Sequence, residues 1–165
     1  MSIITKRGDK GQTDCLYSHK ESKNSSLITA IGAVDELNAF IGLANKNENY
    51  DNVTVKRIQN VLVALMGELS ARPDNFERYK KDFKKVIEQE DIEFLEAIVK
   101  EQEKIVSFKD WATPSSFWDA ATRVCRRCER ELYNYNNNTN SIRPEVLIYV
   151  NRLSDFLWII ARKFD

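Results

Sequence analysis

The chain has 165 residues, enough for one domain (1–165) with a substantial core, and 25 Lys and Arg residues balance 25 Asp and Glu residues. This net charge of +0 removes the general electrostatic argument for nucleic-acid binding. No apolar run approaches the roughly 18 residues of a membrane span, and the N-terminal M-S-I-I-T-K-R-G-D-K lacks the apolar region of a signal peptide. We therefore expect a cytoplasmic protein without a membrane partner.

The first segment, 1–24, is predicted to be non-helical. It begins with β-branched residues, and two glycines interrupt it in T-K-R-G-D-K-G-Q-T (5–13). Backbone amides, hydroxyls and lysines in such a loop can wrap phosphates. The loop matches neither the G-x-x-x-x-G-K-[ST] nor the G-x-G-x-x-G phosphate-binding motif, however, and a loop with two glycines is usually only a turn.

Helical periodicity dominates the rest of the chain (25–165), with apolar stripes predicting helices over about 26–44, 53–72 and 90–106. A charged segment, 73–88, is expected to be an exposed loop or a short helix. Thr113 and Pro114 have the residue types of a helix start, and Pro144 opens the last helix, whose Val146, Val150, Leu153, Leu157 and Ile160 form an a/d stripe. Polar runs at 45–52 and 134–141 are predicted connections. With no strand expected after residue 20, the fold class is all-α, a bundle of four or five helices.

A basic stretch at 119–131, D-A-A-T-R-V-C-R-R-C-E-R-E, lies within the fourth predicted helix. Arg126 and Arg130 are one turn apart, Glu129 is three residues after Arg126, and Thr122 extends the same face. A separate row, Phe117, Ala121, Val124 and Cys128, has the spacing of a buried stripe. The arginines suit either a solvated face with i,i+4 pairs or an anion site for a phosphate chain.

The three cysteines do not indicate a disulfide framework or a metal site. Cys125 and Cys128 form a C-x-x-C motif inside the basic helix, whereas Cys15 lies far away in sequence. Zinc needs four ligands, and the only histidine is His19. We expect ordinary helix packing at the C-x-x-C motif and no protein-bound metal.

Four pieces of sequence together resemble the PduO-type ATP:cob(I)alamin adenosyltransferases. They are T-K-R-G-D-K-G-Q-T, A-I-G-A-V-D-E-L-N (30–38), R-R-C-E-R (126–130) and V-N-R-L-S-D-F-L-W-I-I-A-R (150–162). The resemblance spans nearly the whole chain. It implies a ferritin-like helical bundle that assembles into a homotrimer, with ATP in the cleft between subunits and the N-terminal loop wrapped around the nucleotide.

The resemblance also implies a set of site residues. The nucleotide contacts that it implies are Thr5, Lys6, Arg7, Gly8, Thr13, Asp14, Lys23, Arg126, Arg127, Cys128, Glu129, Arg130 and Asn151. In the implied reaction the cobalt of cob(I)alamin attacks the ribose C5′ of ATP, and triphosphate leaves. Arg126 and Arg130, with Lys6, Lys23 and Mg²⁺, would stabilise the developing charge, while Glu129 would orient the arginines or accept from ribose hydroxyls. No general base is needed.

Some positions depart from the family pattern in the half that binds nucleotide. Thr122 stands where the family has an arginine that pairs with the aspartate of V-D-E-L-N, here Asp35, across the subunit interface. Arg123 is adjacent to Thr122 but points about 100° away. Leu27 replaces a family arginine, and Ile31 replaces a tyrosine.

Other departures affect the corrinoid half. A P-G-G segment before the fourth helix is replaced by K-D-W-A-T-P (109–114), so that Phe108 or Trp111 would supply the aromatic that displaces the lower axial corrinoid ligand. The chain ends at Asp165, whereas many relatives continue with a tail near the corrinoid. The alternatives to transfer activity are therefore a diverged ATP-binding relative, acting as a sensor or corrinoid carrier, and a scaffold without a ligand.

Overall fold

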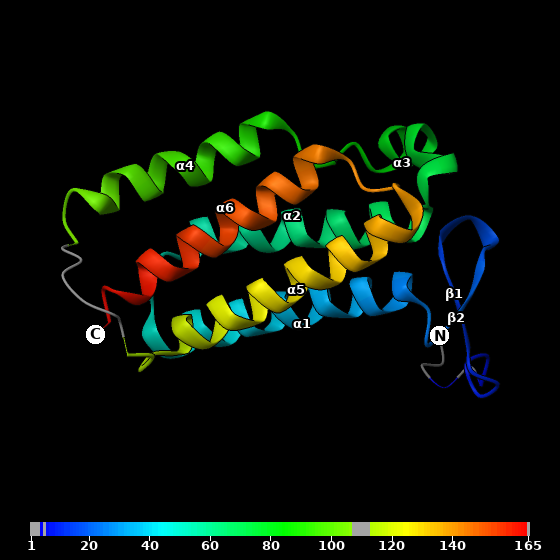
Figure 1. Cartoon of the computed structure of the whole chain (residues 1–165), viewed down its shortest axis with the longest axis horizontal. Helices are drawn as coiled ribbons and strands as arrows, with labels where there is room; N and C mark the ends of the chain where they lie inside the picture. Colours follow the sequence, from blue (N-terminus) through cyan, green and yellow to red (C-terminus); the bar gives the residue numbers. More distant parts are fainter. Residues whose placement is uncertain (1–3, 5, 107–112, 165) are drawn as a thin grey trace.

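The computed structural model describes residues 4, 6–106 and 113–164, most of which are helical (Figure 1). Two short strands and a 3₁₀ helix come first, followed by the six α-helices of the described chain, with a second 3₁₀ helix after α2. The elements are β1 (Gln12–Asp14), η1 (Leu16–Ser18), β2 (Lys20–Ser22), α1 (Ser26–Glu48), α2 (Asn52–Ala71), η2 (Pro73–Asn75), α3 (Phe76–Phe83), α4 (Gln89–Glu103), α5 (Phe117–Thr139) and α6 (Pro144–Ala161).

The long helices form one bundle around a single large core. Helix α1 packs against α2 and α5, α5 also packs against α6, and α6 packs against α4 (Figure 1). The largest fully buried side chains include Trp118 of α5 with Tyr149 and Phe156 of α6. All five residues of the predicted α6 stripe are buried. This arrangement confirms the expected all-α bundle.

Local capping fixes the ends of the helices. The Ser25 hydroxyl accepts from the amide of Ile28 at the start of α1, and the Asp51 carboxylate accepts from the amides of Val53 and Thr54 at the start of α2. Pro144 is at the beginning of α6, as predicted, where its missing N–H leaves no hydrogen bond unmade. These local signals fix the starts of three of the five bundle helices, α1, α2 and α6.

The start and the end of α5 differ from the prediction. The helix begins at Phe117 rather than at Thr113 and Pro114, because Ser116 and Asp119 form a capping box. Its last turns run through the polar sequence predicted as a connection, since the buried ring of Tyr135 holds them against the core. The predicted buried row holds for Ala121, Val124 and Cys128, but Phe117 is 44% exposed.

The ends of other helices also differ from the predicted ends. Helix α1 continues to Glu48, and α4 ends at Glu103, so that Ile105 falls outside the helix and is exposed. The charged 73–88 segment contains the short helix α3. Contrary to the sequence estimate, α1 is long and apolar enough to cross a membrane by length and composition, with a mean hydropathy of 1.5 over one window. This is weak evidence, because core helices of soluble proteins pass the same test.

Residues before α1 form a small hairpin at one end of the bundle (Figure 1). Strands β1 and β2 are antiparallel, with Thr13 opposite Glu21. The sequence predicted no strand after residue 20, which β2 contradicts. Gly11 has a φ of 77°, a conformation that a glycine adopts without a steric penalty, and its carbonyl accepts from the amide of Lys23 at 2.9 Å. The segment is thus folded back on itself.

Candidate functional site

The middle of α5 presents two exposed guanidinium groups one turn apart. Arg126 and Arg130 are both exposed, and Nη1 of Arg130 donates to the carbonyl of Arg126 at 3.1 Å. Neither side chain forms an ion pair with another residue in the described part of the chain. Two uncompensated positive charges on one helix face favour binding of a polyanion over the interpretation as a face of paired charges.

A polar row connects this helix to α6 and α4. Nδ2 of Asn151 donates to Oε1 of Glu129 at 3.2 Å, and Oδ1 of Asn151 accepts from Nη1 of Arg152 at 2.8 Å. Nε of Arg152 donates in turn to Oε1 of Glu96 at 2.9 Å. The structure therefore brings together the predicted residues Glu129 and Asn151, and the row fixes the amide of Asn151 with its oxygen turned toward a cation.

Two other predicted residues in R-R-C-E-R lie in different surroundings. Arg127 forms an ion pair with Glu36 of α1. Cys128 is fully buried in the core, and its burial raises the pKa of its thiol to about 12. The Cys128 side chain consequently acts in packing. Thr122, expected on the arginine face, is also buried, with its hydroxyl donating to the carbonyl of Trp118 at 2.8 Å.

The N-terminal hairpin brings together a second group of predicted residues. Arg7 and Asp14 are 3.5 Å apart as an exposed ion pair. A Cβ built on Gly8 would lie 2.8 Å from Nζ of Lys23, so that the absent side chain leaves room for the lysine amine. Thr13 is half-buried in β1, and Lys6 is exposed with a φ of 56°. Thr5 lies outside the described residues.

In the described part of the chain, no hydrogen bond or ion pair joins the hairpin group to the arginine group. The hydrogen bonds and ion pairs that join residues 6–24 to the bundle lead to α2, η2 and α3. None of these contacts leads to Arg126 or Arg130, which lie in the middle of α5. Both groups carry exposed positive charge, so each is suited to hold one part of a phosphate chain.

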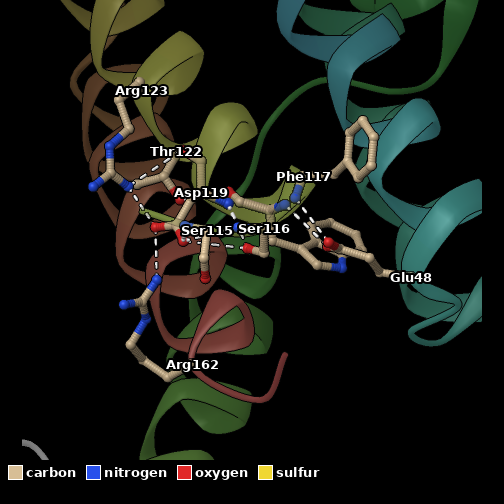
Figure 2. A network of polar contacts seen from close by, with 9 residues as sticks. Glu48, Ser115, Ser116, Phe117, Asp119, Thr122, Arg123 and Arg162 are labelled. Carbon is tan, nitrogen blue, oxygen red and sulfur yellow. Dashed lines mark hydrogen bonds and ion pairs between the residues drawn. The ribbon is translucent and has the colours of Figure 1, made fainter. Parts of the chain in front are cut away.

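A buried network at the start of α5 was missed by the sequence analysis (Figure 2). The Asp119 carboxylate accepts from the amide of Ser115 at 3.0 Å and contacts Nη1 of Arg123 at 2.7 Å and Nη2 of Arg162 at 2.6 Å. The carboxylate of Glu48 accepts from the first two amides of α5. The sequence signal for this start is S-x-x-D (116–119), which competes with the T-P pair at 113–114.

Comparison with known proteins decides the family. The family model for cobalamin adenosyltransferases matches residues 3–164. The chain belongs to the cobalamin adenosyltransferase family. Its relatives include the corrinoid adenosyltransferase of Bacillus subtilis, 32% identical over 98% of this chain and 86% of the relative. The corrinoid adenosyltransferase PduO of Salmonella typhimurium is also 32% identical, but this chain spans only 50% of its length.

Solved structures agree with this assignment to the cobalamin adenosyltransferase family. A variant of the PduO-type ATP:corrinoid adenosyltransferase from Lactobacillus reuteri, complexed with cobalamin and ATP, has a TM-score of 0.84 and 30% identity, covering 98% of this chain and 92% of that chain. Another variant of that enzyme, complexed with ATP, has the same TM-score with 28% identity and covers 98% and 93% of the two chains.

The structure shows the surroundings of the residues that depart from the pattern of the cobalamin adenosyltransferase family. Asp35 is exposed on α1 and forms no ion pair with a described residue, whereas Arg123 is bound to Asp119 and does not take the place of the arginine missing at Thr122. Leu27 is buried and Ile31 is half-buried, so that both have become core residues. Phe108 and Trp111, the predicted corrinoid aromatics, lie outside the described residues.

Proposed function

We propose that this protein transfers the 5′-deoxyadenosyl group of ATP to cob(I)alamin, forming adenosylcobalamin and triphosphate. The observation that carries the proposal is the family match over residues 3–164 together with the uncompensated pair Arg126 and Arg130. Cobalt supplies the electron pair of the new Co–C bond, and the C5′–O bond of ATP breaks with its electrons leaving on triphosphate. The protein's task is to stabilise that leaving charge.

In this proposal the arginines of α5 bind the triphosphate, and Glu129, oriented by Asn151, either holds those arginines or accepts from the ribose hydroxyls. Arg127 and the backbone at Cys128 complete this side. Thr5, Lys6, Arg7, Gly8, Thr13, Asp14 and Lys23 would form the opposite wall. Mg²⁺ would arrive with ATP and be held mainly by phosphate oxygens, since the described residues offer no cluster of three or more His, Cys, Asp or Glu side chains.

The separation of the two groups supports a site between two protomers. The contacts of the hairpin lead to α2, η2 and α3 of its own chain, so we propose that it covers the α5 arginines of a neighbouring protomer in a cytoplasmic homotrimer. A mixing experiment tests this arrangement. Two variants of low activity, Lys23→Ala and Arg130→Ala, should regain part of the lost activity when unfolded and refolded together, but each refolded alone should not. Lack of any recovery in mixed oligomers would contradict the shared site.

The test of transfer uses ATP, Mg²⁺ and chemically reduced cobalamin, with the spectrum of the Co–C product as the readout. Product formation at many turnovers per chain supports the proposal. A diverged ATP-binding relative remains the second candidate, favoured by the buried Thr122 and by Asp35 without an ion pair in the described chain. It would give saturable heat with ATP in calorimetry without the product spectrum, and a scaffold would give neither.

A further inference from the structure

The N-terminal hairpin is attached to α3 by a cluster of three side chains. The phenol of Tyr17 donates to Oδ2 of Asp82 at 2.9 Å, and Cζ of Arg78 is 4.0 Å from the centre of the Tyr17 ring. Nε of Arg78 is also 3.7 Å from Oδ2 of Asp82. Each member of the cluster therefore contacts the other two. Arg78 and Asp82 lie one turn apart on α3, and Tyr17 reaches them from η1.

The backbone at this point is in a conformation that side chains disfavour. Tyr17 has a φ of 57° and a ψ of 37°, and Ser18 has a φ of 65°. Two consecutive non-glycine residues in the left-handed region are uncommon, because the Cβ atom crowds the following carbonyl. Such strain persists only where surrounding contacts over-determine it, and here the contacts of the Tyr17 side chain provide that.

The turn at Tyr17 determines where the hairpin residues lie. The amide of Cys15 donates to the carbonyl of His19 at 2.8 Å, which closes the turn between β1 and β2. The amide of Leu16 also donates to Oγ of Ser70 on α2 at 2.9 Å. Beyond the turn, β2 leads directly to Lys23 and β1 leads back to Gly8. The position of these two residues relative to the bundle therefore depends on η1, together with the contacts of His19 with Asn75 and of Glu21 with Arg72.

We propose that Tyr17, Arg78 and Asp82 are positioning residues for nucleotide binding, which hold the hairpin in the conformation that ATP requires without contacting the ligand. The proposal rests on the proposed function, because it assigns the hairpin to the nucleotide site. A free hairpin would have to be ordered at each binding event, so that loosening the cluster weakens ATP binding. Chemistry at saturating ATP would remain.

The decisive variant is Tyr17→Gly, because glycine removes the anchor and relieves the left-handed strain at once. Asp82→Asn removes the negative charge of the cluster, and Glu77→Gln removes one negative charge from an exposed position of the same helix as a matched control. We expect Tyr17→Gly and Asp82→Asn to raise the KM for ATP by about tenfold or more, with kcat within about twofold of wild type. Glu77→Gln should leave both unchanged.

Hydrogen exchange separates this proposal from the proposed function. Amides of β1 and β2 should exchange faster in Tyr17→Gly than in wild type without any nucleotide, while the melting temperature of the bundle stays the same. Wild-type exchange rates in Tyr17→Gly, or faster exchange accompanied by an unchanged KM, would overturn the positioning role. If the wild-type protein shows no saturable heat with ATP, the proposed function fails, whereas faster exchange in the variant would still establish the anchor.

Discussion

The amide of Asn151 on α6 donates to the carboxylate of Glu129 on α5 at 3.2 Å, which joins two helices at the edge of the arginine face. The hydrogen bond places an uncharged donor beside the only acidic side chain of R-R-C-E-R. Because Oδ1 of Asn151 accepts from Arg152, the orientation of the amide is fixed. The electrostatic balance of the proposed phosphate site therefore depends on residue 151 being neutral.

Asn151→Asp tests that balance. It brings a second carboxylate next to Glu129, and the added negative charge opposes a polyphosphate. We expect the Kd for ATP, measured by calorimetry, to rise by about tenfold or more, which corresponds to about 1.4 kcal/mol. Asn134→Asp adds the same charge at an exposed position further along α5 and serves as the control. Equal affinities in the two variants would argue against a role for Asn151.

The arginines of α5 should differ in their effects on activity. Arg126 and Arg130 have no ion pair in the described structure, whereas Arg127 is paired with Glu36. Removing a charged hydrogen-bond donor to phosphate typically weakens an interaction by about 1.5–3 kcal/mol, so Arg126→Ala and Arg130→Ala should each lower kcat/KM by roughly 10- to 100-fold. We expect a smaller loss for Arg127→Ala. Wild-type kinetics in Arg126→Ala and Arg130→Ala would remove the proposed role of this helix.

The bundle was largely predictable because apolar residues at helical spacing must be buried somewhere. The stripe of α6 and its start at Pro144 are correct for that reason. The start of α5 was not, because both T-P and S-x-x-D are start signals and only the contacts of Asp119 with Arg123 and Arg162 show which one is used. Periodicity alone predicts Thr122 on the exposed face, whereas its side chain is buried and its hydroxyl donates to the carbonyl of Trp118.

The candidate site was less predictable than the fold. Spacing along α5 gave Arg126, Glu129 and Arg130 as one group, because residues three and four apart share a helix face. Contacts between distant segments were not accessible in this way. No pattern in the sequence pairs Arg127 with Glu36 or Tyr17 with Asp82, since those pairs depend on how α1 and α3 pack. The hairpin residues of the candidate site were predicted from the motif resemblance, because composition alone indicates only a turn in that segment.

Thiol reactivity should distinguish the three cysteines. Burial raises the pKa of the Cys128 thiol to about 12 and that of Cys125 well above its ordinary value. Burial also raises the pKa of Cys15, but this side chain is partly exposed and accessible to a reagent. Thiolate is the reactive form, so a disulfide reagent at about pH 8 should modify one thiol in the native protein and three after denaturation. Rapid modification of two or three thiols in the native protein would indicate a reactive C-x-x-C motif and contradict the packing role.

The network at the start of α5 makes a prediction about stability. The carboxylate of Asp119 is almost fully buried and contacts Arg162, whose side chain is only 6% exposed. Asp119→Asn removes the negative charge from a buried pair, which typically destabilises a protein by about 3–5 kcal/mol. Chemical denaturation at pH 7 measures the difference. Asp155→Asn, at an exposed position paired with Arg152, should change the free energy of unfolding by less than about 1 kcal/mol.

The same substitution should change the acid dependence of stability. Burial raises the pKa of Asp119, but the amides of Ser115 and Ser116 and the guanidinium groups of Arg162 and Arg123 outweigh it, so that the pKa lies below its ordinary value. A lowered pKa in the folded state stabilises the protein above about pH 3.9, the value in an unfolded chain, and this contribution is lost as the pH falls through the folded value. The difference in unfolding free energy between wild type and Asp119→Asn should therefore shrink from pH 6 toward about pH 3. A difference that stays constant over this range would show that packing, and not the charge of Asp119, holds the start of α5.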